Sequence, residues 1–149
     1  MMTTRSALLW RTRAEGPGQE WGQWLVGDLM SYDMNNIFAK IIRGEIPSDK
    51  VYEDEHVLAF KDIRPQAKVH VLIIPKGPYV SAQDFSEKAS DAELAAMHRA
   101  IGKVAKAAGV AVTGYRVIAN NGADGRQEVP HLHFHIVGGQ NMGRMVALD

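Results

Sequence analysis

Polar and apolar residues alternate strictly in the segment 131–136, which reads His-Leu-His-Phe-His-Ile. Alternate side chains of a β-strand point to opposite faces, so the pattern predicts a strand with three histidines on one face. The three intervening apolar residues would then face the core. This leaves His131, His133 and His135 available for chemistry.

A short helix is predicted near the start of the patterned region. Apolar residues recur at helical spacing over 37–42, Asn35 or Asn36 can cap the first turn, and Gly44 can end the helix. A longer helix is predicted from Ser90, whose spacing to Glu93 is that of a capping box. An apolar stripe follows this cap and ends at Gly109, which closes the helix.

Four further strands are predicted at 51–53, 57–60, 69–74 and 115–119, because these stretches are rich in β-branched and aromatic residues and are bounded by turn residues. The run 69–74 carries His70 and is otherwise apolar, which is typical of a buried central strand. Strands joined by short turns, with one short and one long helix, predict an antiparallel α+β domain.

Composition limits the classes of function. The 149 residues suit one domain, and 17 basic residues balance 17 acidic ones, so no overall field favours nucleic acid as a partner. There is no cysteine, and no apolar run approaches the roughly 20 residues that span a bilayer. We expect a soluble, cytoplasmic protein without nucleic-acid or membrane partners. Residues 1–33 show no sustained period and are interpreted as a flexible extension of a domain at 34–149.

The histidine face admits three interpretations. The histidines could be ordinary polar residues on a solvated face, but three of the six in the chain lie within five residues. They could bind a metal, but same-face neighbours on a strand lie about 6.5 to 7 Å apart, so a third ligand such as His70 would be needed. The third interpretation is a nucleophile: a neutral imidazole can attack phosphorus while its neighbours orient it.

The nucleophile interpretation is favoured because the loop before the histidines offers phosphate donors. Asn120 and Gln127 supply side-chain amides, and Gly122 and Gly125 suit a loop that exposes backbone N–H groups. The central histidine, His133, is then the natural attacking residue.

With these residues assembled, the sequence resembles the histidine triad family, and in particular its Hint-like branch of nucleoside phosphoramidases. The likeness runs from about residue 36 to residue 139. It rests on the segments 37–47 and 59–63, on His70 with the end of its strand at 73–76, on Asn120 with Gly122, and on 131–139. The resemblance implies an α+β fold with a five-stranded antiparallel sheet, and a homodimer in which two sheets form a continuous one.

The resemblance also implies an activity. His133 would attack the α-phosphorus of an adenosine or guanosine 5'-phosphoramidate, an amine would leave, and water would hydrolyse the nucleotidyl-histidine. His131, His135, His70 and Gln127 would complete the catalytic group, and Asp62 would accept hydrogen bonds from the ribose. The purine nucleotide would be contacted by Ile37, Phe38, Ile41, Phe60, Asp62, Ile63, Asn120, Arg126, Gln127, Glu128, His133 and His135.

The sequence departs from the family pattern near the scissile bond. Arg126 stands where close relatives often have glycine, and Glu128 where many have a serine or threonine. Without cysteine, the zinc site of some relatives cannot be built from the same ligands, and we expect no metal and no cofactor. Two alternatives remain open: a dinucleoside polyphosphate hydrolase or nucleotidyl transferase of the same superfamily, and a nucleotide-binding adaptor.

Overall fold

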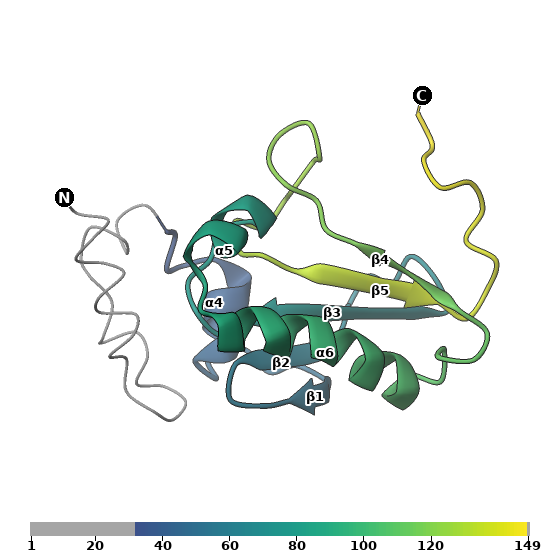
Figure 1. Ribbon diagram of the computed structural model, residues 1–149, viewed down its shortest axis with the longest axis horizontal. Coiled ribbons are helices and arrows are strands. Elements are labelled where there is room, and N and C mark those ends of the chain that lie inside the picture. Colours follow the sequence, from purple (N-terminus) through teal and green to yellow (C-terminus); the bar gives the residue numbers. More distant parts are fainter. Residues whose placement is uncertain (1–31, 149) are drawn as a thin grey trace.

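The computed structural model describes residues 32–148 and is built around one antiparallel sheet. Its strands are β1 (Lys50–Glu53), β2 (Val57–Lys61), β3 (Val69–Pro75), β4 (Tyr115–Ile118) and β5 (Phe134–Gly138). Their spatial order is β1-β2-β3-β5-β4, so β3 is the central strand (Figure 1). The expected five-stranded antiparallel sheet is confirmed.

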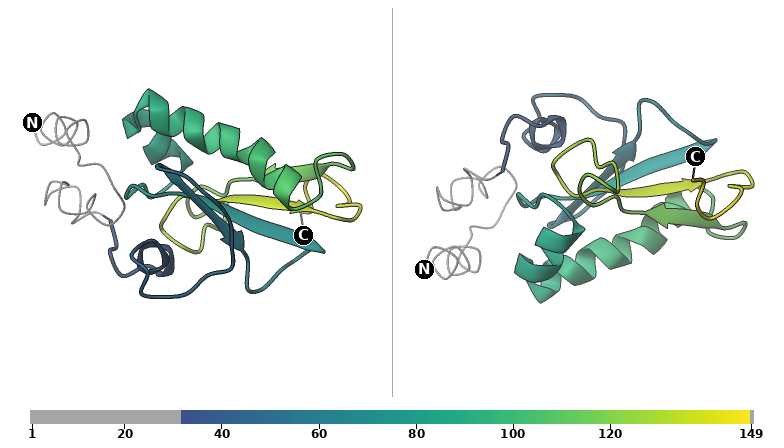
Figure 2. Two further views of the ribbon diagram at one scale, coloured as in Figure 1. Left: turned by 90° about the horizontal axis from the view of Figure 1, so that it is seen from below. Right: turned by 90° about the horizontal axis from the view of Figure 1, so that it is seen from above.

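Helices cover both faces of this sheet. The short helix α4 (Ile37–Ile42) lies on one face, while α5 (Ala82–Lys88) and α6 (Asp91–Ala107) lie on the other (Figure 2). Among the residues that the structure describes, no helix is both long and apolar enough to cross a bilayer.

The sheet therefore buries apolar side chains on two sides. Alternate residues of β2 and β3 enter two separate cores, one beneath α6 and one beneath α4. The α6 side receives Val57, Ala59, Val71 and Ile73, and the α4 side receives Leu58, Phe60, Leu72 and Ile74. Burial on both faces explains why the predicted central strand is continuously apolar instead of alternating.

The predicted helix boundaries are confirmed. The side chain of Asn36 accepts a hydrogen bond from the Ala39 N–H at 2.9 Å, and Gly44 follows α4 with φ of +80°. At the start of α6, Ser90 and Glu93 form both halves of the capping box. Such caps satisfy backbone groups that the first or last turn leaves without helical partners.

Helix α5 was not predicted. It begins after Ser81, whose hydroxyl accepts a hydrogen bond from the Asp84 N–H at 3.2 Å, and only Phe85 of the helix is buried. The spacing of Ser81 and Asp84 was a usable signal for a helix start. A seven-residue helix with one buried side chain gives too little apolar periodicity to be recognised.

The histidine strand begins later than predicted. β5 starts at Phe134, so His131 and His133 precede it and only His135 lies within it. Backbone hydrogen bonds explain this later start. The His131 N–H donates to the Val129 carbonyl and the Leu132 N–H donates to the Tyr79 carbonyl, and neither carbonyl belongs to a strand of the sheet. The alternation of faces is nevertheless kept, since Leu132 enters the core beneath α6 while the histidine rings at 131 and 133 contact Phe38 of α4.

Candidate active site

A cleft of about 920 Å³ opens on the α4 side of the sheet. Its apolar wall contains the five residues expected to enclose a base: Ile37, Phe38, Ile41, Phe60 and Ile63. Phe38 and Phe60 are buried and meet edge to face, whereas the Ile63 side chain at the mouth is 86% exposed. Large apolar side chains exposed at a concave site are typical of a surface that receives a ligand.

The polar part of the same cleft includes six of the side chains predicted to contact a nucleotide. They are Asp62, Asn120, Arg126, Glu128, His133 and His135. Every residue predicted to contact a nucleotide therefore lines the cleft, with the exception of Gln127. His131 and His70 also lie outside the cleft lining and act from behind it.

Gln127 uses its side chain to brace the loop. Its Nε2 donates to the carbonyls of Val80 and Val129 at 2.7 and 3.0 Å, and its Oε1 accepts from the Gly122 N–H at 3.1 Å. The Gly122 N–H, considered above as a phosphate donor, is thus engaged within the loop. Gln127 was predicted to belong to the catalytic group, but its side chain bonds within the loop and does not line the cleft.

Arg126 occupies a backbone conformation that favours glycine. Its φ is +58°, and it is the only non-glycine residue between 32 and 148 with a positive φ. Left-handed backbone costs an ordinary residue about 1 to 2 kcal/mol. Glycine would adopt this backbone without strain, whereas Arg126 brings a cationic side chain to the cleft.

His133 is held in one orientation by its own neighbourhood. Its Nδ1–H donates to the backbone carbonyl of His131 at 2.7 Å, and its ring meets Phe38 edge to face with centroids 5.0 Å apart. A neutral imidazole has one N–H and one lone pair, so this bond assigns the lone pair to Nε2. Burial lowers the pKa of His133, although the nearby carboxylates of Asp62 and Glu128 oppose that shift. The ring is therefore neutral near pH 7 and presents an unprotonated nitrogen.

His131 is fully buried behind His133. Its Nε2–H donates to the Pro75 carbonyl at 2.8 Å, and its Nδ1 accepts from the Tyr32 hydroxyl. Burial lowers the pKa of His131 to about 4. This histidine is a neutral internal support and does not reach the cleft.

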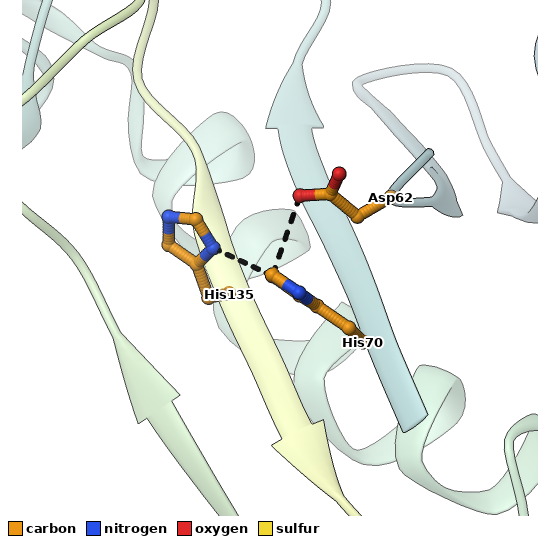
Figure 3. Close-up of side chains that lie close together, drawn as sticks. All are labelled: Asp62, His70 and His135. Carbon is orange, nitrogen blue, oxygen red and sulfur yellow. Dashed lines mark hydrogen bonds and ion pairs between the residues drawn. The ribbon is translucent and has the colours of Figure 1, made fainter. Parts of the chain in front are cut away.

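His135 lies beside His133, with ring centroids 4.9 Å apart, and is linked to a fourth histidine. The Gln66 N–H donates to His70 Nδ1 at 3.0 Å, so the proton of His70 is on Nε2. That Nε2–H lies 2.9 Å from His135 Nδ1 and 3.4 Å from a carboxylate oxygen of Asp62 (Figure 3). His135 therefore accepts at Nδ1 and keeps an Nε2–H donor.

The protonation of these two rings follows from their surroundings. Burial lowers the pKa of His135 to about 4, and repulsion from His133 and His70 adds to the effect. Burial also lowers the pKa of His70, against the attraction of Asp62. For His135, repulsion between neighbouring imidazolium charges is thus a smaller cause of the lowered pKa than burial.

Asp62, His70 and His135 also have the composition of a metal site, since their ligand atoms lie within 4.8 Å of one another. A cation would need the lone pair of His70 Nε2, which would move the ring proton to Nδ1. Nδ1 already receives the Gln66 N–H, so two donors would then face each other. The arrangement thus fits a chain of hydrogen bonds better than it fits metal ligation.

Tyr32 is the site residue that sequence reasoning missed. It was placed in the extension 1–33, of which residues 1–31 lie outside the described part of the chain, yet its side chain is only 3% exposed. The residues around it have no helical or strand period, so no pattern marked it as buried.

Comparisons with known proteins identify the family of the chain. Residues 43–142 match the family model described as HIT domain. The chain is 56% identical over 116 residues to an uncharacterised HIT-like protein of Azospirillum brasilense, a match that covers 78% of this chain and 95% of that protein. It is 48% identical over 111 residues to a protein of Escherichia coli K12 named purine nucleoside phosphoramidase, covering 74% of this chain and 92% of the relative.

Solved structures give the same result. A HIT family hydrolase from Clostridium thermocellum superposes with a TM-score of 0.71 at 46% identity, covering 76% of this chain and 97% of that one. A histidine triad protein from Clostridium difficile superposes with a TM-score of 0.67 at 48% identity, covering 74% and 96%. With the matched domain and the placement of its histidines, the chain belongs to the HIT, or histidine triad, family.

Proposed function

We propose that this protein hydrolyses purine nucleoside 5'-phosphoramidates through a nucleotidyl intermediate on His133. The observation that carries the proposal is the hydrogen bond from His133 Nδ1 to the His131 carbonyl, which leaves Nε2 unprotonated beside an apolar cleft. The name of the Escherichia coli relative, purine nucleoside phosphoramidase, supports the choice of substrate.

The reaction has two displacements at phosphorus. His133 Nε2 donates its lone pair to the α-phosphorus, and the P–N bond of the substrate breaks as the departing amine takes a proton from solvent. The resulting imidazolium is stabilised because its Nδ1–H already donates to the His131 carbonyl. Water then attacks the same phosphorus and loses a proton to solvent as the bond to Nε2 breaks, which regenerates neutral His133 and releases a nucleoside monophosphate.

His135 would stabilise charge on the phosphoryl group. Its Nε2–H is the donor that remains after Nδ1 accepts from His70, and its ring lines the cleft beside His133. A donor fixed before the reaction stabilises developing negative charge without reorganisation. His70 would thus act through His135, by fixing its tautomer.

The rest of the nucleotide would follow the cleft. The base would lie between Phe38, Phe60 and the neighbouring isoleucines, and the ribose hydroxyls would donate to Asp62, whose side chain is about one-fifth exposed. Arg126 and Glu128 would lie on the side of the departing amine.

A homodimer is part of the proposal. β4 is an edge strand of the sheet and Val117 on it is 42% exposed, so a second copy could extend the sheet there. Sedimentation equilibrium should give twice the chain mass, and a monomer at micromolar concentration would contradict the dimer.

The first experiment compares substrates. With a chelator present, purified protein should hydrolyse adenosine 5'-phosphoramidate faster than a dinucleoside polyphosphate at equal concentration.

The nucleophile is tested by substitution. His133→Ala should abolish release of the amine while the variant still binds adenosine monophosphate. The variant His98→Ala is the control, because His98 is exposed on α6. Preference for the polyphosphate would favour the other hydrolase or transferase activity, and binding without turnover would favour an adaptor. Normal turnover by folded His133→Ala would refute the nucleophile.

The second prediction concerns the ribose. Asp62→Ala should reduce the preference for ribonucleoside over 2'-deoxyribonucleoside phosphoramidates by about 1 to 3 kcal/mol, the usual cost of a lost buried hydrogen-bond partner. Asp49→Ala is a matched control, because Asp49 lines the same cleft but pairs with Lys61 at 3.5 Å. The ratio of kcat/KM values for the two sugars measures the effect. An unchanged ratio in Asp62→Ala would remove the ribose role.

The third prediction is the acid limb of the pH profile. Protonation of Nε2 removes the attacking lone pair, and burial lowers the pKa of His133 from the ordinary 6.5. Activity should therefore persist below pH 6.5 and fall only as the pH passes through the lowered value. The Glu128 carboxylate raises the pKa of His133, so Glu128→Gln should move the limb of kcat/KM to lower pH. A limb above pH 7, or a shift to higher pH in this variant, would contradict a buried neutral nucleophile.

A further inference from the structure

Tyr32 precedes the region matched by the HIT domain model and is packed against the centre of the site. Its hydroxyl donates to His131 Nδ1, and the two rings meet edge to face with centroids 5.6 Å apart at 69°. Burial raises the pKa of Tyr32, so its hydroxyl remains protonated and able to donate well above neutral pH. Tyr32 does not line the cleft and cannot contact a substrate there directly.

The Tyr32 hydroxyl completes the hydrogen bonding of a fully buried ring. His131 Nε2–H already donates to the Pro75 carbonyl at 2.8 Å, so Nδ1 is the acceptor that needs a partner. An unsatisfied acceptor in such a position is costly, and an imidazole without it can rotate or exchange its tautomer. The two bonds together fix both the plane and the tautomer of His131.

Fixing this ring has a consequence for the nucleophile. The backbone carbonyl of His131 is the acceptor for His133 Nδ1–H, and it lies before β5, outside the regular ladder of the sheet. The position of that carbonyl therefore depends on local anchors, which include the His131 ring and the bond from the His131 N–H to the Val129 carbonyl.

We propose that Tyr32 is a positioning residue for the nucleophile: its hydroxyl anchors the His131 ring, and through the His131 carbonyl it sets the orientation of His133. The inference rests on the proposed phosphoramidase activity. It assigns a role in catalysis to a residue N-terminal to the matched domain. A simple packing role would need only the aromatic ring, which phenylalanine also supplies.

The test is Tyr32→Phe in the full chain, with Tyr52→Phe as the matched control. Tyr52 also loses a bonded hydroxyl, since it donates to Asp54 at 2.7 Å, but it lies in β1, away from the cleft lining. We expect kcat for adenosine 5'-phosphoramidate to fall about tenfold in Tyr32→Phe, as small misplacements of reacting groups do. The Kd for adenosine monophosphate should stay within about twofold, because no contact in the cleft is changed. The control should retain both values.

Nitrogen-15 spectra of the histidine rings supply a readout independent of turnover. In Tyr32→Phe the Nδ1 signal of His131 should move as its hydrogen bond is lost, and the signals of His133 should move with it. If the protein turned over no phosphoramidate, the proposed function would fail, yet these shifts would still test the link from Tyr32 to His133. Unmoved His133 signals, or an unchanged kcat in Tyr32→Phe, would overturn the positioning role.

A double variant tests the route. If Tyr32 acts through His131, adding Tyr32→Phe to His131→Ala should lower kcat no further than His131→Ala alone. Independent losses that multiply in the double variant would show that Tyr32 contributes only general stability.

Discussion

The site depends on one hydrogen bond, from Nδ1 of His133 to the backbone carbonyl of His131. It fixes the tautomer of His133, the proposed nucleophile, and so decides which nitrogen carries the lone pair. A side-chain acceptor could rotate away, whereas a carbonyl is as fixed as the backbone that carries it. The late start of β5 leaves this carbonyl outside the ladder between strands, where it accepts from the His133 ring.

The same logic of donors and acceptors extends through the neighbouring histidines. A backbone N–H from Gln66 sets the tautomer of His70, which sets that of His135, and the Pro75 carbonyl does the same for His131. Burial then keeps these rings neutral, since the free energy needed to remove an imidazolium from water exceeds its attraction to the nearby carboxylates. The sheet supplies that burial because helices cover both of its faces. The architecture thus determines the protonation state of the histidine rings.

Much of this arrangement was predictable from local patterns. The caps of α4 and α6, the buried central strand and the alternation after His131 each depend on residues close in sequence, and the structure confirms them. What could not be predicted depends on long-range contacts. The Leu132 N–H bonds to the Tyr79 carbonyl, which delays β5, and the side chain of Gln127 turns to Val80. Tyr32 reaches a partner 99 residues away.

The most direct test of the account is the tautomer of His133 in the resting protein. Nitrogen-15 shifts of the six histidine rings at pH 7, with His133 assigned from its alanine variant, report which nitrogen bears the proton. The account predicts a neutral ring with the proton on Nδ1 and a lone pair on Nε2. A His133 that is an imidazolium at pH 7, or that carries its proton on Nε2, would contradict it.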